Sequence, residues 1–327
     1  MFVLLKFNTK MMSENLDGLV SKMLGRPYLI IMGAGKLSKW LGCSREDIYT
    51  ARTIVREIQR KEDESEEIIN LPKILLIDIE TSPISSYTWG LWKQDVHLDQ
   101  IISNWFMLTW SAKWLYSADV MSDRISALEV LEEDDSRIVK SLLMLLDKAD
   151  VVIAHNGNAF DVVKINARAI RWGLRPPSPY QQIDTLLIAR KQFGFSSNKL
   201  EALARMFGIP GKTDTNFKLW AECMKGNQEA LINMEEYNKN DVIVLEEVYL
   251  KLRPWVKGHI NLGLYGDGSK IICPNCGSSH LHEDVNYYYT PAGRYKTYRC
   301  QCGAISRSRA TDIKADERKN IVISVAR

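Results

Sequence analysis

The stretch Lys73–Glu80, KILLIDIE, decides the fold of the central part of this chain. The continuous apolar run from Ile74 to Ile77 is typical of a strand that is buried on both faces. Side chains two positions apart on a strand point to the same side, so Asp78 and Glu80 project together where the strand ends. Neighbouring carboxylates raise each other's pKa unless they share a cation, and oxygen ligands suit Mg²⁺ or Mn²⁺. The stretch therefore predicts a buried strand that ends in a metal site.

Further strands and helices are expected after this first strand. The apolar patterns predict strands over Trp105–Tyr116 and Val151–Ala154, and helices over Ser136–Lys148, Ala159–Trp172, Lys199–Phe207 and Met234–Leu252. Strands that come first and are followed by strand–helix alternation favour an α/β fold, of the α+β type with a mixed sheet.

Two later segments carry acidic residues in comparable settings. His155–Asp161, HNGNAFD, follows a predicted strand and opens a helix, so Asp161 falls in the first helical turn, where the helix dipole stabilises a carboxylate. Tyr237 and Asp241 are four residues apart in a predicted helix, which puts both on one face. A hydroxyl and a carboxylate placed in this way can both interact with one water molecule.

Taken in order, the segments DIET (Asp78–Thr81), HNGNAFD and YNKND (Tyr237–Asp241) resemble the exonuclease motifs of the DEDD, DnaQ-like superfamily. The similarity covers Pro72–Pro254 and points to the tyrosine subclass, DEDDy, which has a ribonuclease H-like fold. The resemblance implies a 3′–5′ exonuclease with two Mg²⁺ or Mn²⁺ ions.

The same resemblance implies a role for each residue of the motifs. Asp78, Glu80 and Asp241 would hold one ion, while Asp78 also reaches the second with support from Asp161. Tyr237 would orient the attacking water. Two ions about 4 Å apart can stabilise both the entering and the leaving oxygen of a phosphoryl transfer, which agrees with these roles.

Other polar residues near these motifs are interpreted as structural. Asp184 is expected to support the fold, and Asn156 and Asn158 are expected to cap the following helix rather than to contact substrate. His155 is expected to be a loop histidine with satisfied hydrogen bonds.

Residues 33–61 predict a helix-turn-helix. A helix over Ala34–Leu41 would break at Gly42, and Ser44 is a good N-cap for a second helix. The pattern resembles homeodomain-like and resolvase-like modules. It implies nucleic-acid-binding residues on an exposed face of the second helix, namely Arg45, Tyr49, Arg52, Arg56 and Arg60. The alternative is a helical hairpin that packs on the nuclease core or on a protein partner.

Residues 258–327 predict a zinc ribbon and a tail. Two cysteine pairs, Cys273 with Cys276 and Cys300 with Cys302, suit one tetrahedral Zn²⁺ of structural type, and a glycine follows each pair. His280 and His282 are alternative ligands. Cys43 and Cys223 are expected to be unpaired and partly buried.

The segment between the cysteine pairs predicts a β-hairpin that turns at Pro291–Gly293. It mixes aromatic and basic residues, as single-strand binders do: Tyr287, Tyr288, Tyr289, Tyr295, Tyr298, Arg294, Lys296 and Arg299. The alternative is that these tyrosines are ordinary strand residues.

Charge and composition narrow the class of function. The net charge is only +3 over 327 residues, but basic segments flank the acidic centre, which suits a polyanionic substrate. No apolar run is long enough to span a membrane, and the paired cysteines fit a reducing compartment, so a cytoplasmic protein is expected. We further expect an extension over 1–32, a linker over 62–71 and a nuclease domain over 72–257.

DNA is the expected substrate because of the helix-turn-helix. The alternatives are a ribonuclease D-like exoribonuclease, with RNA as the substrate, and a DNA-binding regulatory or assembly factor that has kept the nuclease fold without activity. The compact set of modules suggests a gene of a phage or mobile element.

Overall fold

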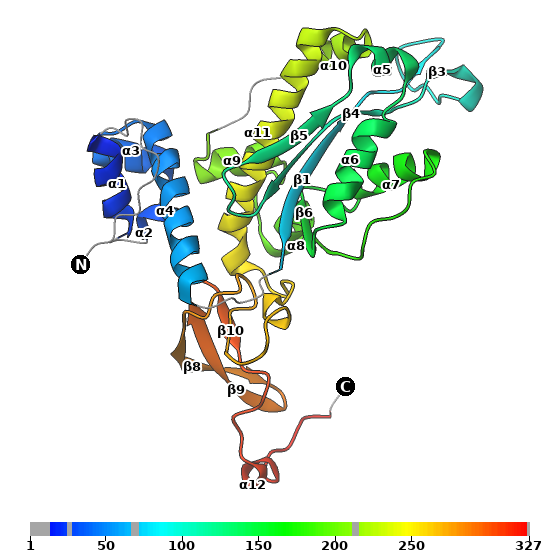
Figure 1. Ribbon diagram of the computed structural model, residues 1–327. Coiled ribbons are helices and arrows are strands. Elements are labelled where there is room, and N and C mark those ends of the chain that lie inside the picture. Colours follow the sequence, from blue (N-terminus) through cyan, green and yellow to red (C-terminus); the bar gives the residue numbers. More distant parts are fainter. Residues whose placement is uncertain (1–13, 25–27, 67–71, 211–215, 326–327) are drawn as a thin grey trace.

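The computed structural model describes residues 14–24, 28–66, 72–210 and 216–325 (Figure 1). At its centre is a five-stranded sheet with the strand order β5-β4-β1-β6-β7. The strands are β1 (Ile74–Thr81), β4 (Met107–Trp114), β5 (Val120–Arg124), β6 (Val151–Ala154) and β7 (Gln181–Asp184). The pairs β1–β4 and β4–β5 are antiparallel, whereas β1–β6 and β6–β7 are parallel. The mixed sheet predicted from the sequence is confirmed.

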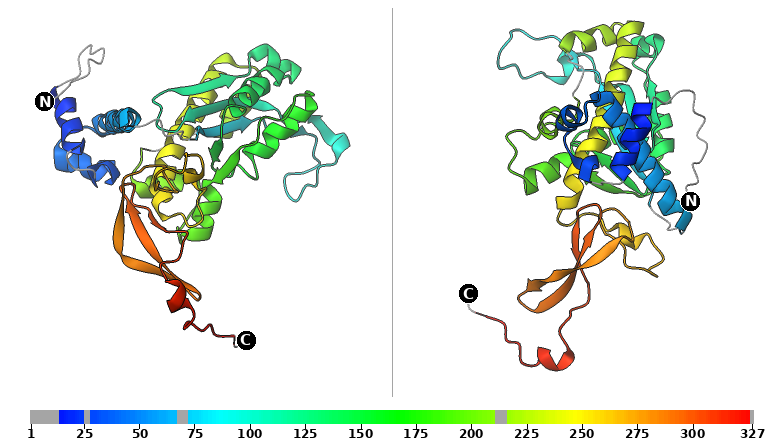
Figure 2. Two further views of the ribbon diagram at one scale, coloured as in Figure 1. Left: turned by 60° about the horizontal axis from the view of Figure 1, so that its bottom comes forward. Right: turned by 90° about the vertical axis from the view of Figure 1, so that its left-hand side faces the viewer.

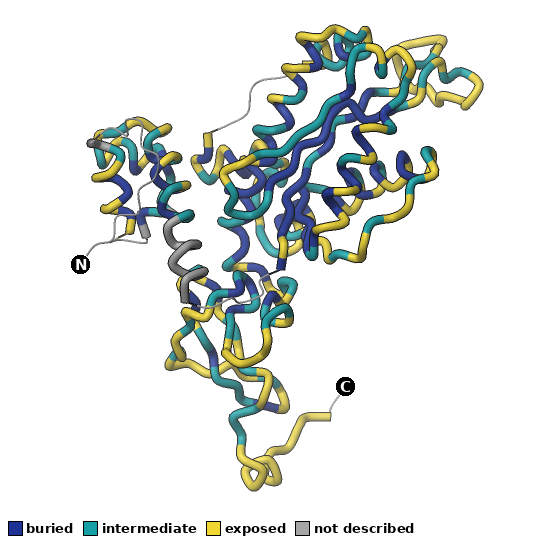
Figure 3. The backbone as a smooth tube through the Cα atoms, in the orientation of Figure 1, coloured by how far each residue is buried: buried dark blue, intermediate teal, exposed yellow. Residues whose placement is uncertain are grey.

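Strand β1 lies in the middle because it is apolar on both faces. Leu75, Ile77 and Ile79 belong to a core shared with α6 (Ser136–Leu146) and α7 (Asp161–Arg171). Ile74 and Leu76 belong to a core on the opposite face, shared with α11 (Gln228–Leu252). Helices therefore cover both faces of the sheet, and its strands β1, β4 and β6 are buried along most of their length (Figure 3).

Two short strands and four short α-helices, besides short 3-10 helices, complete the described residues of this part. They are β2 (Ser85–Ser86), β3 (Ile101–Ser103), α5 (Ala127–Glu132), α8 (Thr185–Gln192), α9 (Leu200–Phe207) and α10 (Phe217–Met224). The predicted strands and helices are confirmed, with end points that agree to within two residues except at the start of α11. This helix begins before the predicted Met234 because Asn227 caps it, accepting hydrogen bonds from the amides of Glu229 and Ala230.

Among the described residues, four helices precede the sheet: α1 (Glu14–Leu24), α2 (Tyr28–Ile31), α3 (Ala34–Leu41) and α4 (Arg45–Glu66). The predicted helix boundary is confirmed, since Gly42 ends α3 at φ 67° and the Ser44 hydroxyl accepts a 3.0 Å hydrogen bond from the Asp47 amide. Residues 62–66 of the expected linker are part of α4. Residues 67–71, and residues 1–13 of the expected extension, lie outside the described part.

The C-terminal part is a three-stranded antiparallel sheet in the order β10-β9-β8. Its strands are β8 (Leu281–Thr290), β9 (Gly293–Cys300) and β10 (Ile305–Arg307), and the short helix α12 (Ala315–Arg318) follows. The hairpin predicted to turn at residues 291–293 is confirmed. This small sheet lies beyond the end of α11, away from the five-stranded sheet (Figure 2).

Candidate active site

Asp78 and Glu80 continue the row of β1 side chains that faces α11. The earlier members of the row, Ile74 and Leu76, pack against Val242 and other apolar residues of that helix. Since side chains alternate along a strand, the same row carries both carboxylates to the border between sheet and helix. Both residues are partly buried there.

Helix α11 supplies a third carboxylate to this border. Carboxylate oxygens of Asp78, Glu80 and Asp241 all lie within 4.8 Å of one another. Tyr237 is buried one helical turn before Asp241. Asn238, which is fully buried, donates a hydrogen bond of 2.6 Å from Nδ2 to Oδ2 of Asp78. The helix therefore both completes the acidic cluster and fixes the orientation of one of its members.

Asp161 is the first residue of α7 and reaches the cluster from the other side of the sheet. Its Oδ1 accepts a hydrogen bond of 3.1 Å from the amide of Ile79, which stands between Asp78 and Glu80 on β1. The structure thus brings together the four carboxylates named from the sequence, here termed the acidic cluster: Asp78, Glu80, Asp161 and Asp241.

The electrostatics of the acidic cluster favour a bound cation. Burial raises the pKa of Asp78 well above its usual range, and the charges of Asp161, Glu80 and Asp241 raise it further. Burial also raises the pKa of Asp161, to about 7. Carboxylates crowded out of water are costly as anions, and a shared divalent cation offsets that cost. An all-oxygen donor set suits Mg²⁺ or Mn²⁺, so the residues present fit such ions.

The loop before α7 is held by Asp184. The amides of Asn156 and Asn158 donate hydrogen bonds of 3.1 Å to its carboxylate, which also caps α8. The structural role predicted for Asp184 is therefore confirmed. The capping role predicted for Asn156 and Asn158 is wrong, because α7 has no side-chain cap.

His155 in the same loop has both ring nitrogens satisfied. Nδ1 lies 2.9 Å from Thr185 Oγ1, and Nε2 lies 3.0 Å from the carbonyl oxygen of Asn198. The expected satisfied loop histidine is confirmed.

A pocket of about 640 Å³ opens beside the acidic cluster. Two of its lining residues adjoin cluster members, since Thr81 follows Glu80 and Tyr237 precedes Asp241 by one turn. The Tyr237 ring meets that of Trp220 edge-on, with centroids 6.2 Å apart. The remaining lining residues come from the segment after β1, from α7 and from the start of α10: Ser82, Pro83, Ile84, Trp105, Lys164, Asn216 and Phe217.

One wall of the pocket is anchored by a buried ion pair. Arg168 of α7 contacts Asp135 through two hydrogen bonds of 2.7 Å, and the same carboxylate accepts the amide of Met107. Arg168 also donates to the carbonyl oxygen of Trp105. A two-pronged arginine–carboxylate contact fixes geometry as well as contributing energy. This network therefore sets the position of Trp105 relative to α7.

Three residues of this region escaped the sequence interpretation. Asn238 lies inside the YNKND motif, and Lys164 lies one turn after Asp161 in α7, so helical spacing from the motifs was a signal for both. Trp105 carried no such signal. Trp105 lies in the pocket because the loop that leads into β4 passes beside it.

The predicted exposed basic face of α4 is corrected by the structure. Arg52 is only 3% exposed and donates hydrogen bonds to the carbonyl oxygens of Leu29 and Met32. Arg56 pairs with Glu247 of α11 at 2.5 Å. Both side chains therefore make their polar contacts within the protein, Arg52 inside the helical module and Arg56 with the core. The prediction that Arg52 and Arg56 are available to nucleic acid is therefore wrong.

The other residues of that face differ in their setting. The Tyr49 hydroxyl donates a hydrogen bond of 3.2 Å to the carbonyl oxygen of Gly208, at the end of α9, so it too joins the helices to the core. Arg45 is exposed at the start of α4. The side chain of Arg60 lies outside the described part.

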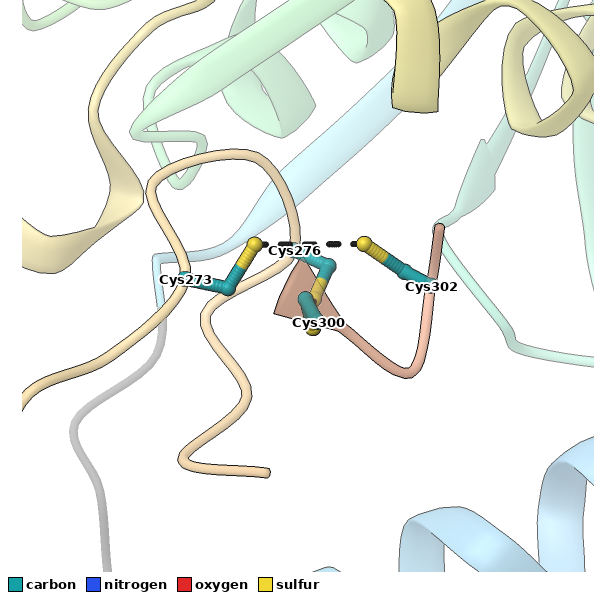
Figure 4. A group of neighbouring side chains, drawn as sticks. All are labelled: Cys273, Cys276, Cys300 and Cys302. Atoms are coloured by element: carbon teal, nitrogen blue, oxygen red, sulfur yellow. Dashed lines mark hydrogen bonds between the residues drawn. The ribbon is translucent and has the colours of Figure 1, made fainter. Parts of the chain in front are cut away.

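The four cysteines of the C-terminal part form one group (Figure 4). All four Sγ atoms lie within 4.8 Å of one another, with Cys276 and Cys300 at 3.5 Å and Cys273 and Cys302 at 3.8 Å. Within the described residues none of them forms a disulfide. His280 and His282 do not belong to this group.

The chemistry of this group fits a zinc ion. Hydrogen bonding from Cys276 lowers the pKa of Cys273 to about 7, whereas contacts with Cys273 and the other sulfurs raise the pKa of Cys276 far above its usual range. Crowded thiols share protons in this way, and a cation would displace them. Gly277 and Gly303, at φ 78° and 91°, turn the chain after each pair. Four sulfurs close the coordination shell, which suits structural Zn²⁺.

Arginines lie over some of the tyrosine rings of the β8–β9 hairpin. The Arg307 guanidinium is 4.2 Å from the centre of the Tyr295 ring, and that of Arg294 is 5.1 Å from the Tyr287 ring. Lys296 pairs with Glu283 at 3.0 Å. Part of the positive charge is therefore neutralised within the hairpin, and a single-strand binding surface there stays a prediction.

Comparisons with known proteins bear on the central part of the chain. Residues 117–253 match the RNase_H superfamily, a stretch that includes Asp161, Tyr237 and Asp241 and leaves out β1. A PolC-type DNA polymerase III from Ureaplasma parvum serovar 3 is 40% identical over 62 residues, which are 18% of this chain and 4% of that protein. Within the described residues, none of the helices is both long and apolar enough to cross a membrane.

A solved structure, that of the family B DNA polymerase from the hyperthermophilic archaeon Pyrobaculum calidifontis, aligns with a TM-score of 0.40 at 13% identity. The alignment covers 57% of this chain and 26% of the polymerase. This chain thus spans a small part of the length of either polymerase. The superfamily match and the mixed sheet together identify the centre of this chain as a ribonuclease H-like α/β domain.

Proposed function

We propose that this protein is a metal-dependent 3′–5′ exonuclease that hydrolyses phosphodiester bonds of DNA. The observation that carries the proposal is the acidic cluster, because four carboxylates from three separate elements converge at the end of β1. The RNase_H superfamily match over residues 117–253 supports a nuclease, and the local similarity to a DNA polymerase supports a nucleic-acid substrate.

The cluster residues are assigned as metal ligands within this proposal. Asp78, Glu80 and Asp241 would hold one Mg²⁺ or Mn²⁺ ion, and Asp161 would support a second ion together with Asp78. Bound divalent ions lower the pKa of water and offset negative charge on a phosphoryl group. Tyr237, which lies in the pocket wall one turn before Asp241, would orient the attacking water.

Without bound cations, the ionised carboxylates of the acidic cluster would repel one another in a buried position. The raised pKa of Asp78 arises first from burial and then from the charges of its acidic neighbours Asp161, Glu80 and Asp241. Crowded buried carboxylates destabilise the folded protein, and perturbed groups of this kind are concentrated at functional sites. An active site that binds cations accounts for it better than a silent scaffold does.

The choice of DNA over RNA rests on the local similarity to a PolC-type DNA polymerase III, since Arg52 and Arg56 of the basic face expected on α4 make contacts within the protein. We assign α3 and α4 instead to a helical module that packs on the core. The zinc ribbon is assigned one structural Zn²⁺ ion and an auxiliary role in substrate binding.

End-labelled oligonucleotides test this proposal directly. Single-stranded DNA, duplex DNA and RNA carrying a 5′ label are incubated with wild type in Mg²⁺, in Mn²⁺ and in EDTA. A 3′–5′ exonuclease yields a ladder of shortened labelled products on DNA in the metal arms only, whereas an exoribonuclease yields it on RNA.

Two variants make the test specific to the acidic cluster. Asp78→Ala should abolish the ladder, and Glu132→Ala, which removes an exposed carboxylate of α5, should leave it unchanged. Intact substrates in every arm, with folded wild type, would exclude the nuclease and leave the DNA-binding or assembly factor.

A further inference from the structure

We propose that Lys164 is a phosphate-binding residue of the pocket beside the acidic cluster, and that the ligand of this pocket is one nucleotide unit. The inference rests on the proposed function and deepens it by assigning the substrate contact that the motifs leave open. Lys164 lies on α7 one turn after Asp161, so the helix that supplies a cluster carboxylate also supplies this cation.

The shape and lining of the pocket suit a nucleotide. A volume of about 640 Å³ is within the usual range for small-molecule sites, which is on the order of 300–1,000 Å³. Rings of Trp105, Phe217 and Trp220 line it, and Phe217 is 69% exposed. Aromatic faces of this kind stack on any base, with a contribution of about 1–3 kcal/mol for each stacked base.

The Lys164 ammonium group is held in the pocket by neutral partners. Nζ lies 3.9 Å from the centre of the Trp105 ring and 5.0 Å from that of Phe160, and it donates a hydrogen bond of 3.1 Å to Thr81 Oγ1. Within the described part of the chain, no carboxylate forms an ion pair with it. The charge is therefore positioned by the fold but not neutralised by it.

This setting contrasts with other cations of the core. Lys113 pairs with Glu246 at 2.8 Å, and Arg168 pairs with Asp135 at 2.7 Å, so each has an acidic partner. A buried or half-buried cation without one is unusual, because desolvation costs free energy that an anion would offset. Burial accordingly lowers the pKa of Lys164, and a phosphate group beside it would oppose that shift.

The Lys164 charge lies close to the acidic cluster, where the reacting end of the substrate would bind. Thr81, which accepts the Lys164 hydrogen bond, directly follows Glu80 of the acidic cluster. A phosphate between Lys164 and the cluster ions would be bound on two sides, while the attached base lies against the aromatic wall. The lysine thus selects a phosphate-bearing ligand, and the rings accept bases of any sequence.

The test measures binding rather than turnover. A fluorescein-labelled oligodeoxythymidine is titrated with full-length protein in Ca²⁺, and anisotropy is recorded at several salt concentrations. The variants are Lys164→Ala, Lys164→Met and Lys164→Arg. Arg171→Ala is the matched control, because it removes an exposed cation from the same helix outside the pocket.

Loss of one charge-assisted phosphate contact should weaken binding by about tenfold or more. The slope of log affinity against log salt should become shallower by about 0.7, the value for one phosphate of a single strand. Lys164→Met should match Lys164→Ala, Lys164→Arg should stay near wild type, and Arg171→Ala should keep both the affinity and the slope.

Outcomes for the lysine and for the nuclease are separable. If Lys164→Ala binds with the affinity and salt slope of wild type, or if Arg171→Ala changes both equally, the phosphate contact is refuted while cleavage by wild type stands. Wild type that binds in a Lys164-dependent manner but never cleaves would refute the proposed function alone. Lack of binding by folded wild type would refute the inference.

Discussion

Asp161→Asn should stabilise the metal-free protein while destroying the site. The substitution keeps the size of the side chain and the oxygen that accepts the Ile79 amide at 3.1 Å, so it removes the charge and little else. Burial raises the pKa of Asp161 from 3.8 to about 7. At high pH the folded state therefore carries an anion that would be more stable in the unfolded chain.

The magnitude follows from the size of this shift. A difference of about 3 pKa units corresponds to about 4 kcal/mol of destabilisation when the group is ionised in both states. Below pH 7 the folded protein takes up a proton that the unfolded chain does not hold. The destabilisation then declines by about 1.4 kcal/mol for each pH unit and vanishes near the pKa of the unfolded chain.

Urea unfolding in EDTA, followed by tryptophan fluorescence at pH 8.5, 7.0 and 5.5, measures this effect. We expect Asp161→Asn to exceed wild type in the free energy of unfolding by up to about 4 kcal/mol at pH 8.5, and by about 2 kcal/mol less at pH 5.5. Glu132→Gln, which neutralises an exposed carboxylate, should stay within about 0.5 kcal/mol of wild type at each pH.

Divalent ions should reduce the stability advantage of Asp161→Asn over wild type. Mg²⁺ or Mn²⁺ stabilises a folded protein that binds it and has no effect on one that does not. Wild type should therefore gain stability in the metal at pH 8.5, and Asp161→Asn should gain less. Equal stability of the two proteins in EDTA at pH 8.5, or a difference that does not depend on pH, would refute the argument that burial of this carboxylate is costly.

Three other changes test separate parts of the structure. Asn238→Ala removes the 2.6 Å hydrogen bond to Asp78 and should weaken the metal affinity by about 10- to 100-fold in a Mn²⁺ titration. Unchanged affinity would show that this contact does not position Asp78 as a ligand. Elemental analysis of the purified wild type should find one zinc ion per chain, and Cys276→Ser should contain less. An unchanged zinc content in the variant would contradict a zinc site at the four cysteines. Arg56→Ala should destabilise the protein by about 3–5 kcal/mol if Glu247 is left buried and unpaired, and the double variant with Glu247→Ala should recover part of the loss in urea unfolding. A salt-dependent loss of DNA affinity in Arg56→Ala with no loss of stability would instead favour the DNA-binding role that its burial argues against.

The helical module shows where sequence reasoning stops. The turn at Gly42 and the cap at Ser44 were predictable, because φ preference and capping depend on neighbouring residues. Whether α4 presents Arg52 and Arg56 to solvent depends on partners that lie far away along the chain, such as Glu247. No local pattern carries that information, and the expected exposed face proved wrong for this reason.

The sequence by itself determined the secondary structure around KILLIDIE, the side on which Asp78 and Glu80 project, the spacing of Tyr237 and Asp241, and the two cysteine pairs. These depend on the two-residue period of a strand, the helical period and short loops, which are local properties. Only the tertiary structure decided that Asn238 holds Asp78, that Asp161 binds the amide of Ile79, and that Lys164 lies in an aromatic pocket with no ion-pair partner among the described residues. Such contacts join residues distant in sequence, and their geometry is set by how α7 and α11 pack on opposite faces of the sheet.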